Sequence, residues 1–211
     1  MLEARPVARP SRQHRACGGR CPKRVAAFCG KIANMGFSFF RRQRTAAAGL
    51  EHALKQMRTA AFFAPTPWAV CRQMLEFAEV GSNDLVYDLG SGDGRIPIMA
   101  AQEFGARAIG IELDEKLRKH AEDKAREYGL SERVLFRADD FFKADLRDAT
   151  VITLYLLTQV NGYLGPRLAS QLKKGSRVVA LDYPVPGWRQ EKELPVRSEG
   201  NVDYNLFLYR R

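Results

Sequence analysis

The sequence predicts an α/β fold with a doubly wound, mostly parallel sheet of seven strands and an antiparallel C-terminal hairpin. From Leu85 onward, short apolar runs alternate with amphipathic segments, and strand–helix alternation is typical of a parallel sheet. The run Val151–Leu154 is apolar enough to be covered by helices on both faces of such a sheet. The last two extended segments flank the turn sequence Glu199–Asn201, which favours a hairpin.

The length of 211 residues suits one domain with an extension. We expect residues 1–44 to be a basic, disordered N-terminal extension, residues 45–80 to form N-terminal helices and a lid, and residues 81–211 to form the main domain. Residues 1–60 contain 13 Lys and Arg and 2 acidic residues, whereas residues 61–211 contain 21 and 22. The net charge of +10 therefore belongs to the N-terminal segment, and the main domain lacks the basic excess that nucleic-acid binding requires.

Two helices are expected before the sheet. Thr45–Arg58 is rich in Ala, Leu and Met and is expected to pack on the domain edge, with contact to a membrane surface or a partner as the alternative. Phe62–Pro67 is expected to be extended, because each proline disfavours helical backbone in the residue before it. Pro67 suits the first position of the second helix, with Thr66 as its N-cap. The buried face of that helix is expected at Val70, Met74, Leu75 and Ala78.

The remaining elements follow from apolar runs and the glycines that separate them. Strands are expected at Leu85–Asp88, Ala106–Glu112, Arg133–Arg137, Thr150–Leu156 and Ser176–Asp182, and the hairpin at Glu193–Arg197 and Asp203–Tyr209. The connecting helices are expected to end near Phe104, to span Asp114–Tyr128 with Gly129 as a cap, and to span Val160–Lys173.

A glycine-rich turn, Asp88-Leu89-Gly90-Ser91-Gly92-Asp93-Gly94, joins the first strand to its helix. Glycines accept positive φ and let the backbone approach a ligand, and the free N–H groups of the following helix point at whatever lies above the turn. The third glycine comes one residue too early for the G-x-G-x-x-G fingerprint of dinucleotide binding, because Arg95 occupies that place. A P-loop is also excluded, since no lysine follows the glycines.

Acidic residues stand at the ends of three successive strands, namely Asp88, Glu112 and Asp140. Ligands of open α/β sheets bind beyond the carboxyl ends of the strands, where the strand order reverses. Carboxylates at this place would repel a pyrophosphate, but they accept hydrogen bonds from ribose hydroxyls well. The pattern therefore favours a nucleoside with a positive charge over a nucleotide.

The string D-L-G-x-G-x-G after a strand resembles motif I of the seven-strand, Rossmann-like methyltransferases that use S-adenosylmethionine. With Phe63–Pro67 upstream and Thr153–Leu157 downstream, the chain from about Phe62 to Arg211 is similar to the lysine methyltransferases of ATP synthase c-subunit and adenine nucleotide translocase type and to their prokaryotic relatives. This resemblance implies that residues 81–211 are an S-adenosylmethionine-binding methyltransferase domain and that the methyl acceptor is a protein lysine.

The resemblance also implies roles in cofactor binding. Glu112 would hold the ribose hydroxyls. Asp140 would accept from the adenine amine, with the Phe141 N–H and Leu113 beside the base. Asp88 would order the glycine turn and bind the methionine ammonium. The other expected cofactor contacts are Gly90, Ser91, Gly92, Asp93 and, from the lid, Thr66.

The methyl acceptor is expected at the ends of the fourth and fifth strands. A lysine amine has a reference pKa of ~10.4 and must lose its proton before attack. Burial lowers that pKa, and aromatic rings or a carboxylate can take up the cation or the departing proton. We therefore expect Tyr155 and Asp182 as the catalytic residues. The N-P-P-Y and D-P-P-Y motifs of adenine-N6 and glutamine methyltransferases do not follow the fourth strand, and Cys71 lies too early for a cytosine-type nucleophile.

Four cysteines do not make a disulfide framework in a chain of this length, so we expect a reducing compartment. Cys17, Cys21 and Cys29 lack the C-x2-C pairs of zinc sites, and we expect no metal. We expect a cytoplasmic protein, with mitochondrial import as the alternative if residues 1–44 are a presequence. Two functional alternatives are a methyltransferase of a small metabolite or RNA, and a non-catalytic module that docks on lipid or RNA through its basic tail.

Overall fold

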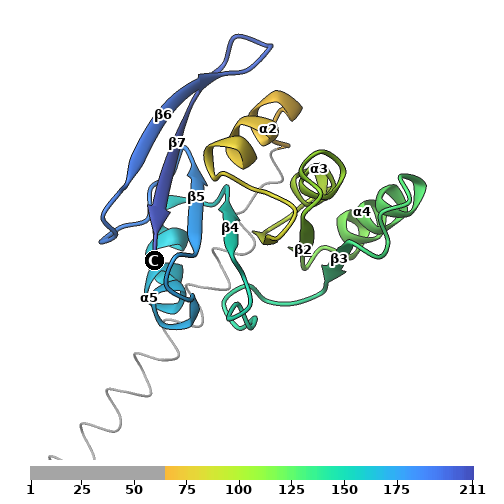
Figure 1. The fold of residues 1–211 in the computed structure, drawn as a ribbon, viewed down its shortest axis with the longest axis horizontal. Helices are drawn as coiled ribbons and strands as arrows, with labels where there is room; N and C mark the ends of the chain where they lie inside the picture. The colour runs from red at the N-terminus through yellow and green to blue at the C-terminus, as the bar shows by residue number, and fades with distance from the viewer. Residues whose placement is uncertain (1–64) are drawn as a thin grey trace, which may run out of the picture. The chain divides into compact units, whose positions relative to one another are not determined.

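A computed structural model describes residues 65–211 of the protein. The expectations for the N-terminal extension, for the helix at Thr45–Arg58 and for the cysteine cluster lie outside these described residues. The described helices are α2 (Trp68–Phe77), α3 (Arg95–Phe104), α4 (Glu115–Glu127) and α5 (Thr158–Gln171) (Figure 1). The strands are β1 (Leu85–Leu89), β2 (Arg107–Ile111), β3 (Val134–Arg137), β4 (Val151–Leu154), β5 (Arg177–Leu181), β6 (Lys192–Arg197) and β7 (Asp203–Arg210).

The strands form one seven-stranded sheet in the order β3-β2-β1-β4-β5-β7-β6. The first five of these run parallel, while β7 is antiparallel to β5 and β6 is antiparallel to β7. The predicted fold class is therefore confirmed, including the C-terminal hairpin. The chain builds β1, β2 and β3 in one direction and then returns to β4 on the other side of β1, so the strand order reverses between β1 and β4.

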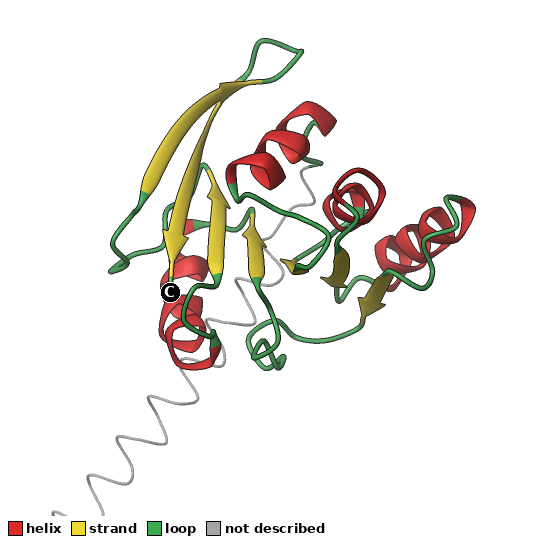
Figure 2. Ribbon diagram, in the orientation of Figure 1, coloured by secondary structure: helices red, strands yellow, loops and turns green. Residues whose placement is uncertain are grey.

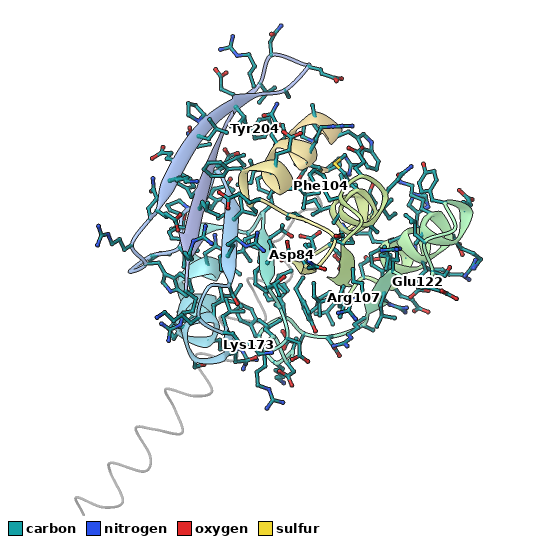
Figure 3. All side chains as sticks on the ribbon, viewed as in Figure 1. Asp84, Phe104, Arg107, Glu122, Lys173 and Tyr204 are labelled. Atoms are coloured by element: carbon teal, nitrogen blue, oxygen red, sulfur yellow. The ribbon has the colours of Figure 1, made fainter. Side chains whose placement is uncertain are left out.

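Helices cover the parallel part of the sheet on both faces, with α2, α3 and α4 on one face and α5 on the other (Figures 1 and 2). All four residues of β4 are buried, as its apolar sequence predicts for a strand covered on both sides. On α2, the predicted buried face is also confirmed, since Val70, Met74, Leu75 and Ala78 are fully buried. Tyr204 of the hairpin packs against the same apolar cluster, beside α2 (Figure 3).

The helix boundaries agree with the prediction to within two residues, and α3 ends at Phe104 as predicted. α2 begins at Trp68, and Pro67 is its N-cap with φ −56° and ψ 143°. The prediction of Pro67 as the first helical residue and Thr66 as the N-cap is therefore wrong by one position. The cause is the extended ψ of Pro67, whose carbonyl accepts the first helical hydrogen bond from the Cys71 N–H at 2.9 Å. α4 begins one residue later than predicted, because Asp114 is its N-cap and its side chain accepts from the N–H groups of Lys116 and Leu117. Gly129, the predicted cap, follows the C-cap residue Tyr128 with φ 69°.

A largely buried ion pair stabilises the edge of the sheet where the parallel strands begin. Arg177 of β5 pairs with Asp84, and both side chains are 13% exposed. The same guanidinium donates to the carbonyls of Ala78 and Glu79 after α2, and Asp84 accepts from the Thr150 hydroxyl at 2.7 Å. These bonds tie α2, β1, β4 and β5 together at this edge (Asp84 is labelled in Figure 3), and the opposite edge carries the polar residues of the candidate site. None of the described helices has the length and apolarity to cross a membrane.

Candidate active site at the carboxyl edge of the sheet

The glycine turn between β1 and α3 is hydrogen-bonded to the end of β2. Gly90, Gly92 and Gly94 all have positive φ, at 82°, 53° and 79°. The N–H groups of Gly90 and Ser91 donate to the carbonyl of Ile111, at 2.9 and 3.1 Å. Because these conformations are left-handed, side chains at the three glycine positions would strain the turn. The turn therefore holds one tight shape at the start of α3.

Asp88 lies in β1 between Gly110 of β2 and Thr153 of β4, and its side chain is almost fully buried. The Thr153 hydroxyl donates to Asp88 Oδ1 at 2.6 Å. Burial raises the pKa of Asp88 to about 7; the Thr153 hydrogen bond opposes this rise, and the charges of Glu112 and Asp93 add to it. A buried carboxyl of this kind gains from a cation placed next to it.

Glu112 follows β2 directly and organises the turn with both carboxylate oxygens. The Gly92 N–H donates to Oε2 at 2.9 Å, and the Asp114 N–H donates to Oε1 at 2.8 Å. Each carboxylate oxygen can accept a further hydrogen bond, so these contacts leave room for donors of a ligand. Glu112 therefore has both a structural role in the turn and the capacity to bind hydroxyl groups.

Asp140 follows β3, the strand next to β2, and its Oδ1 accepts from the Phe142 N–H at 3.0 Å. The Phe141 and Phe142 rings lie 4.7 Å apart, and Leu113 is 48% exposed at the neighbouring strand end. The structure thus brings Asp88, Glu112 and Asp140 to the ends of three adjacent strands on one edge of the sheet. Their individual roles in ligand binding stay predictions.

Asp93 is held by two cations rather than open to the solvent. Its carboxylate pairs with Arg95 at 2.7 Å and with Lys124 of α4 at 3.5 Å. Burial works to raise the pKa of Asp93, but the hydrogen bonds and charge of Arg95 outweigh it and hold the pKa below its usual value. Arg95 also donates to the Thr66 carbonyl and lies 5.4 Å from the centre of the Trp68 ring. Asp93 and Arg95 therefore tie the predicted lid residue Thr66 to the glycine turn.

The predicted catalytic residues lie farther along the same edge. The Tyr155 ring, directly after β4, stacks on that of Tyr183 with centroids 6.1 Å apart and planes at 29°. Burial raises the pKa of Tyr155, and the nearby Asp182 charge raises it further. Asp182 has φ 58°, and its Oδ1 accepts from the Asn205 N–H of β7 at 2.9 Å. The structure brings Tyr155 and Asp182 together, with part of the Asp182 carboxylate engaged by β7.

Two observations indicate that a ligand fits at the turn. The Ser91 hydroxyl is buried and has no hydrogen-bond partner among the described residues. A Cβ at Gly90 would lie 3.2 Å from a Leu156 methyl group, so the glycine keeps open the space between the turn and the segment after β4. The carboxylate acceptors, the unpartnered Ser91 hydroxyl and the open space at Gly90 suit a ligand with an uncharged ribose and a positively charged chain. Within residues 65–211, no group of three His, Cys, Asp or Glu side chains is placed to hold a metal.

Three contributors to the site are not among the residues that the sequence predicts for it. A Cβ at Gly110 of β2 would lie 2.5 Å from the Phe136 ring, so this glycine lets Phe136 pack beneath the turn. A glycine inside an apolar strand is itself a sequence signal of such close approach. Tyr183 carries a weaker signal, since it is an aromatic residue two positions after a strand that ends at the site.

Residues 88–192 match the ANTKMT methyltransferase domain. Over 148 residues the chain is 40% identical to a protein-lysine N-methyltransferase of Saccharolobus islandicus, which covers 70% of this chain and 91% of that protein. It is 39% identical to the mouse adenine nucleotide translocase lysine N-methyltransferase over 58% of this chain, but only 51% of the mouse protein is matched. The crystal structure of a protein described as an RNA methyltransferase from Salinibacter ruber, in complex with S-adenosylhomocysteine, shares 45% identity and a TM-score of 0.65 and covers 70% of this chain and 93% of that one.

The fold and the carboxyl-edge site define a class I, Rossmann-like methyltransferase that uses S-adenosylmethionine. Within this class, the chain belongs to the protein-lysine N-methyltransferase family that carries the ANTKMT methyltransferase domain. The resemblance inferred from D-L-G-x-G-x-G and its flanking motifs is thereby confirmed.

Proposed function

We propose that this protein transfers the methyl group of S-adenosylmethionine to the side-chain amine of a lysine in a protein. The observation that carries the proposal is the set of Asp88, Glu112 and Asp140 at three adjacent strand ends around a glycine turn of fixed shape. The names of relatives add support, since both the archaeal and the mouse protein are described as lysine N-methyltransferases.

When bound, the cofactor supplies a methyl group attached to a positively charged sulfur. In our proposal Glu112 accepts from the ribose hydroxyls while it keeps its bonds to the Gly92 and Asp114 N–H groups. Asp140, which follows β3, accepts from the adenine amine, and Leu113, exposed after the neighbouring β2, lies beside the base. The buried Asp88 faces the ammonium of the amino acid part, and Ser91 offers its unpartnered hydroxyl.

The acceptor amine would lie against the Tyr155 and Tyr183 rings, beside Asp182. Aromatic faces attract a cation, and partial burial favours the neutral amine that can attack the methyl carbon. Displacement needs the amine, the methyl carbon and the sulfur in line, so the task of these residues is placement and exclusion of water. The nearby carboxylate of Asp182 stabilises the substituted ammonium that methylation leaves.

A protein acceptor fits the charge of the domain better than RNA does. Residues 61–211 contain 21 Lys and Arg and 22 acidic residues, and RNA or DNA binding depends on a surplus of positive charge. The Salinibacter protein, however, is described as an RNA methyltransferase. Transfer of labelled methyl groups therefore has to distinguish a protein acceptor from RNA.

Two measurements test the proposal. Isothermal titration with S-adenosylhomocysteine should give a Kd in the micromolar range or tighter, and folded protein that does not bind would refute the cofactor assignment. Transfer of labelled methyl groups into cell lysate should yield a product that protease digests and nuclease does not, with methyl-lysine after acid hydrolysis. A label that only nuclease removes would assign the activity to RNA.

We expect S-adenosylhomocysteine to bind more weakly as the pH falls from about 8 to about 6. Without ligand the Asp88 carboxyl, with its pKa raised to about 7 by burial, takes up a proton in this range and must lose it again to face an ammonium group. Below the pKa, affinity should fall by up to about tenfold per pH unit. Calorimetry at several pH values measures the slope.

The variant Asp88→Asn is the control for this pH dependence. It keeps an acceptor for the Thr153 hydroxyl, and it should bind S-adenosylhomocysteine weakly, with little change in affinity between these pH values. If the affinity of Asp88→Asn for S-adenosylhomocysteine falls with pH as steeply as that of the wild type, another group is responsible for the pH dependence.

The raised pKa of Asp88 also predicts how the stability of the ligand-free fold depends on pH. Because the folded pKa lies above the unfolded one, the stability that this carboxyl contributes is complete below about pH 4 and is lost as the pH rises through about 7.

Replacing Tyr155 with alanine should lower kcat/KM for the protein acceptor by roughly 2- to 30-fold, because one face of a cation–aromatic contact is lost. The Kd of S-adenosylhomocysteine should stay within about twofold. Tyr155→Phe keeps the ring and should lose less. Tyr128→Ala removes an exposed tyrosine after α4, far along the sheet from β4, and serves as the matched control. Equal losses in both alanine variants would contradict the role of Tyr155.

For residues 1–60 we propose peripheral contact with anionic lipid, supported by 13 Lys and Arg against 2 acidic residues. The site of action would be the cytoplasm, or the mitochondrion if residues 1–44 direct import. Sedimentation of the full chain with phosphatidylserine vesicles, with Arg41 and Arg42 changed to Gln in the comparison protein, tests the lipid contact. Equal sedimentation of both proteins would contradict a role for these two arginines.

A further inference from the structure

Asn161 of α5 is a fully buried polar residue that no step proposed above requires. It lies on the inner face of the helix together with Val160, Leu164 and Leu168. Its side-chain oxygen is buried and has no hydrogen-bond partner among the described residues. A buried polar atom without a partner destabilises a fold, and a leucine would fill a similar volume without burying a polar atom. Packing of α5 therefore does not account for this amide.

The amide nitrogen of Asn161 joins two segments that are distant in the sequence. Nδ2 donates to the carbonyl of Leu156, after β4, at 3.0 Å, and to the carbonyl of Tyr183, after β5, at 2.7 Å. The register between the two strands ends at Leu154 and Ala180. The two hydrogen bonds therefore continue the connection between these segments beyond the last paired residues of the sheet.

These two segments carry the aromatic pair of the acceptor site. Tyr155 immediately precedes Leu156, and the carbonyl of Tyr183 itself is one of the two acceptors. The two rings stack with their centroids 6.1 Å apart. A change in the spacing of the segments would thus move one ring relative to the other, while the glycine turn, which is held by Ile111 and Glu112, would keep its own bonds.

We propose that Asn161 is a positioning residue of the methyl-acceptor site, whose side-chain amide holds the segments after β4 and β5 at the spacing that places the Tyr155 and Tyr183 rings for the acceptor lysine. This inference rests on the proposed function, because it assumes that the acceptor packs against these rings. It assigns to α5 a role in acceptor binding although Asn161 itself is fully buried and does not contact the acceptor.

The variant Asn161→Leu tests this role, because it removes both hydrogen bonds and keeps a similar volume. The acceptor is the protein that the wild-type enzyme labels most strongly in lysate, purified from the lysate. We expect KM for this acceptor to rise about tenfold, because the displaced rings would lose contact with the acceptor amine, and the Kd of S-adenosylhomocysteine to stay within about twofold. A merely structural role would reduce the folded fraction, and so the rate at every acceptor concentration, without raising KM.

Leu168→Val is the matched control, since it also alters a fully buried residue of α5 but makes no bond to either segment. It should lower the melting temperature and leave KM for the acceptor and the Kd of S-adenosylhomocysteine unchanged. If Asn161→Leu does not fold, Asn161→Ser decides, because its hydroxyl can donate to only one of the two carbonyls, and KM for the acceptor should rise above that of the wild type. An unchanged KM in a folded Asn161 variant overturns the inference. Absence of methyl-lysine in the wild-type reaction would instead refute the proposed function.

Discussion

Replacing Gly94 with alanine is expected to destabilise the fold by about 2–5 kcal/mol, which lowers the melting temperature by roughly 4–20 °C. The residue has φ 79° at the start of α3, a conformation that costs a side chain ~1–2 kcal/mol. A Cβ there would also lie 2.6 Å from the Ala121 Cβ and 2.6 Å from the Phe136 ring. Since α4 and β3 hold these neighbours, overpacking adds ~1–3 kcal/mol.

Two other glycines separate the backbone effect from the packing effect. Gly129 also has positive φ, at 69°, but an added Cβ there would meet nothing within 4 Å. Gly129→Ala should therefore show only the backbone cost of ~1–2 kcal/mol. Gly81→Ala has neither strain nor close contacts and should be nearly neutral. Thermal unfolding of the three variants tests the order, and a Gly94 variant no less stable than the Gly129 variant would contradict the close packing under the turn.

Replacing Glu112 with alanine should weaken S-adenosylhomocysteine binding by roughly 5- to 150-fold, which corresponds to ~1–3 kcal/mol of charge-assisted hydrogen bonding. The variant loses the proposed acceptor of the ribose hydroxyls. It also releases the Gly92 and Asp114 N–H groups, so the turn loses part of its support. Titration calorimetry measures the affinity, and thermal unfolding without ligand shows how much of the loss comes from the turn.

Two variants control for charge and for location. Glu112→Gln keeps one side-chain oxygen and should bind with an affinity between those of wild type and Glu112→Ala. Glu115→Ala removes an exposed acid from the first turn of α4, three residues away, and should leave the affinity unchanged within about twofold. Wild-type affinity in Glu112→Ala would exclude Glu112 from cofactor binding.

The fold and the class of the site could be predicted because their signals are local in the sequence. Apolar runs separated by glycine and turn residues identify each strand, and Asp88, Glu112 and Asp140 stand at or just after strand ends, where parallel strands bring them to one edge. The start of α4 is predicted to within one residue, because the groups that fix it, the Asp114 side chain and the N–H groups of Lys116 and Leu117, lie within one helical turn.

Contacts between distant residues could not be predicted in the same way. The pairing of Asp93 with Lys124 and the bond between Asp182 and Asn205 join segments whose approach depends on the whole fold. Asn161 looks like an ordinary polar position of an amphipathic helix, yet it is fully buried. The start of α2 differs from the prediction by one residue, because the sequence shows that Pro67 fits a first turn but not that its ψ is extended.

The Phe136 ring lies against the positions where Cβ atoms of Gly94 and Gly110 would be. At Gly110 the backbone φ is not positive, so only the ring and the movable Ser91 hydroxyl exclude a side chain there. Glycine is therefore required at position 110 only because position 136 carries a large side chain, that of Phe136. Family members with a small residue at the position of Phe136 should tolerate alanine at the position of Gly110, and the two sites should vary together through evolution.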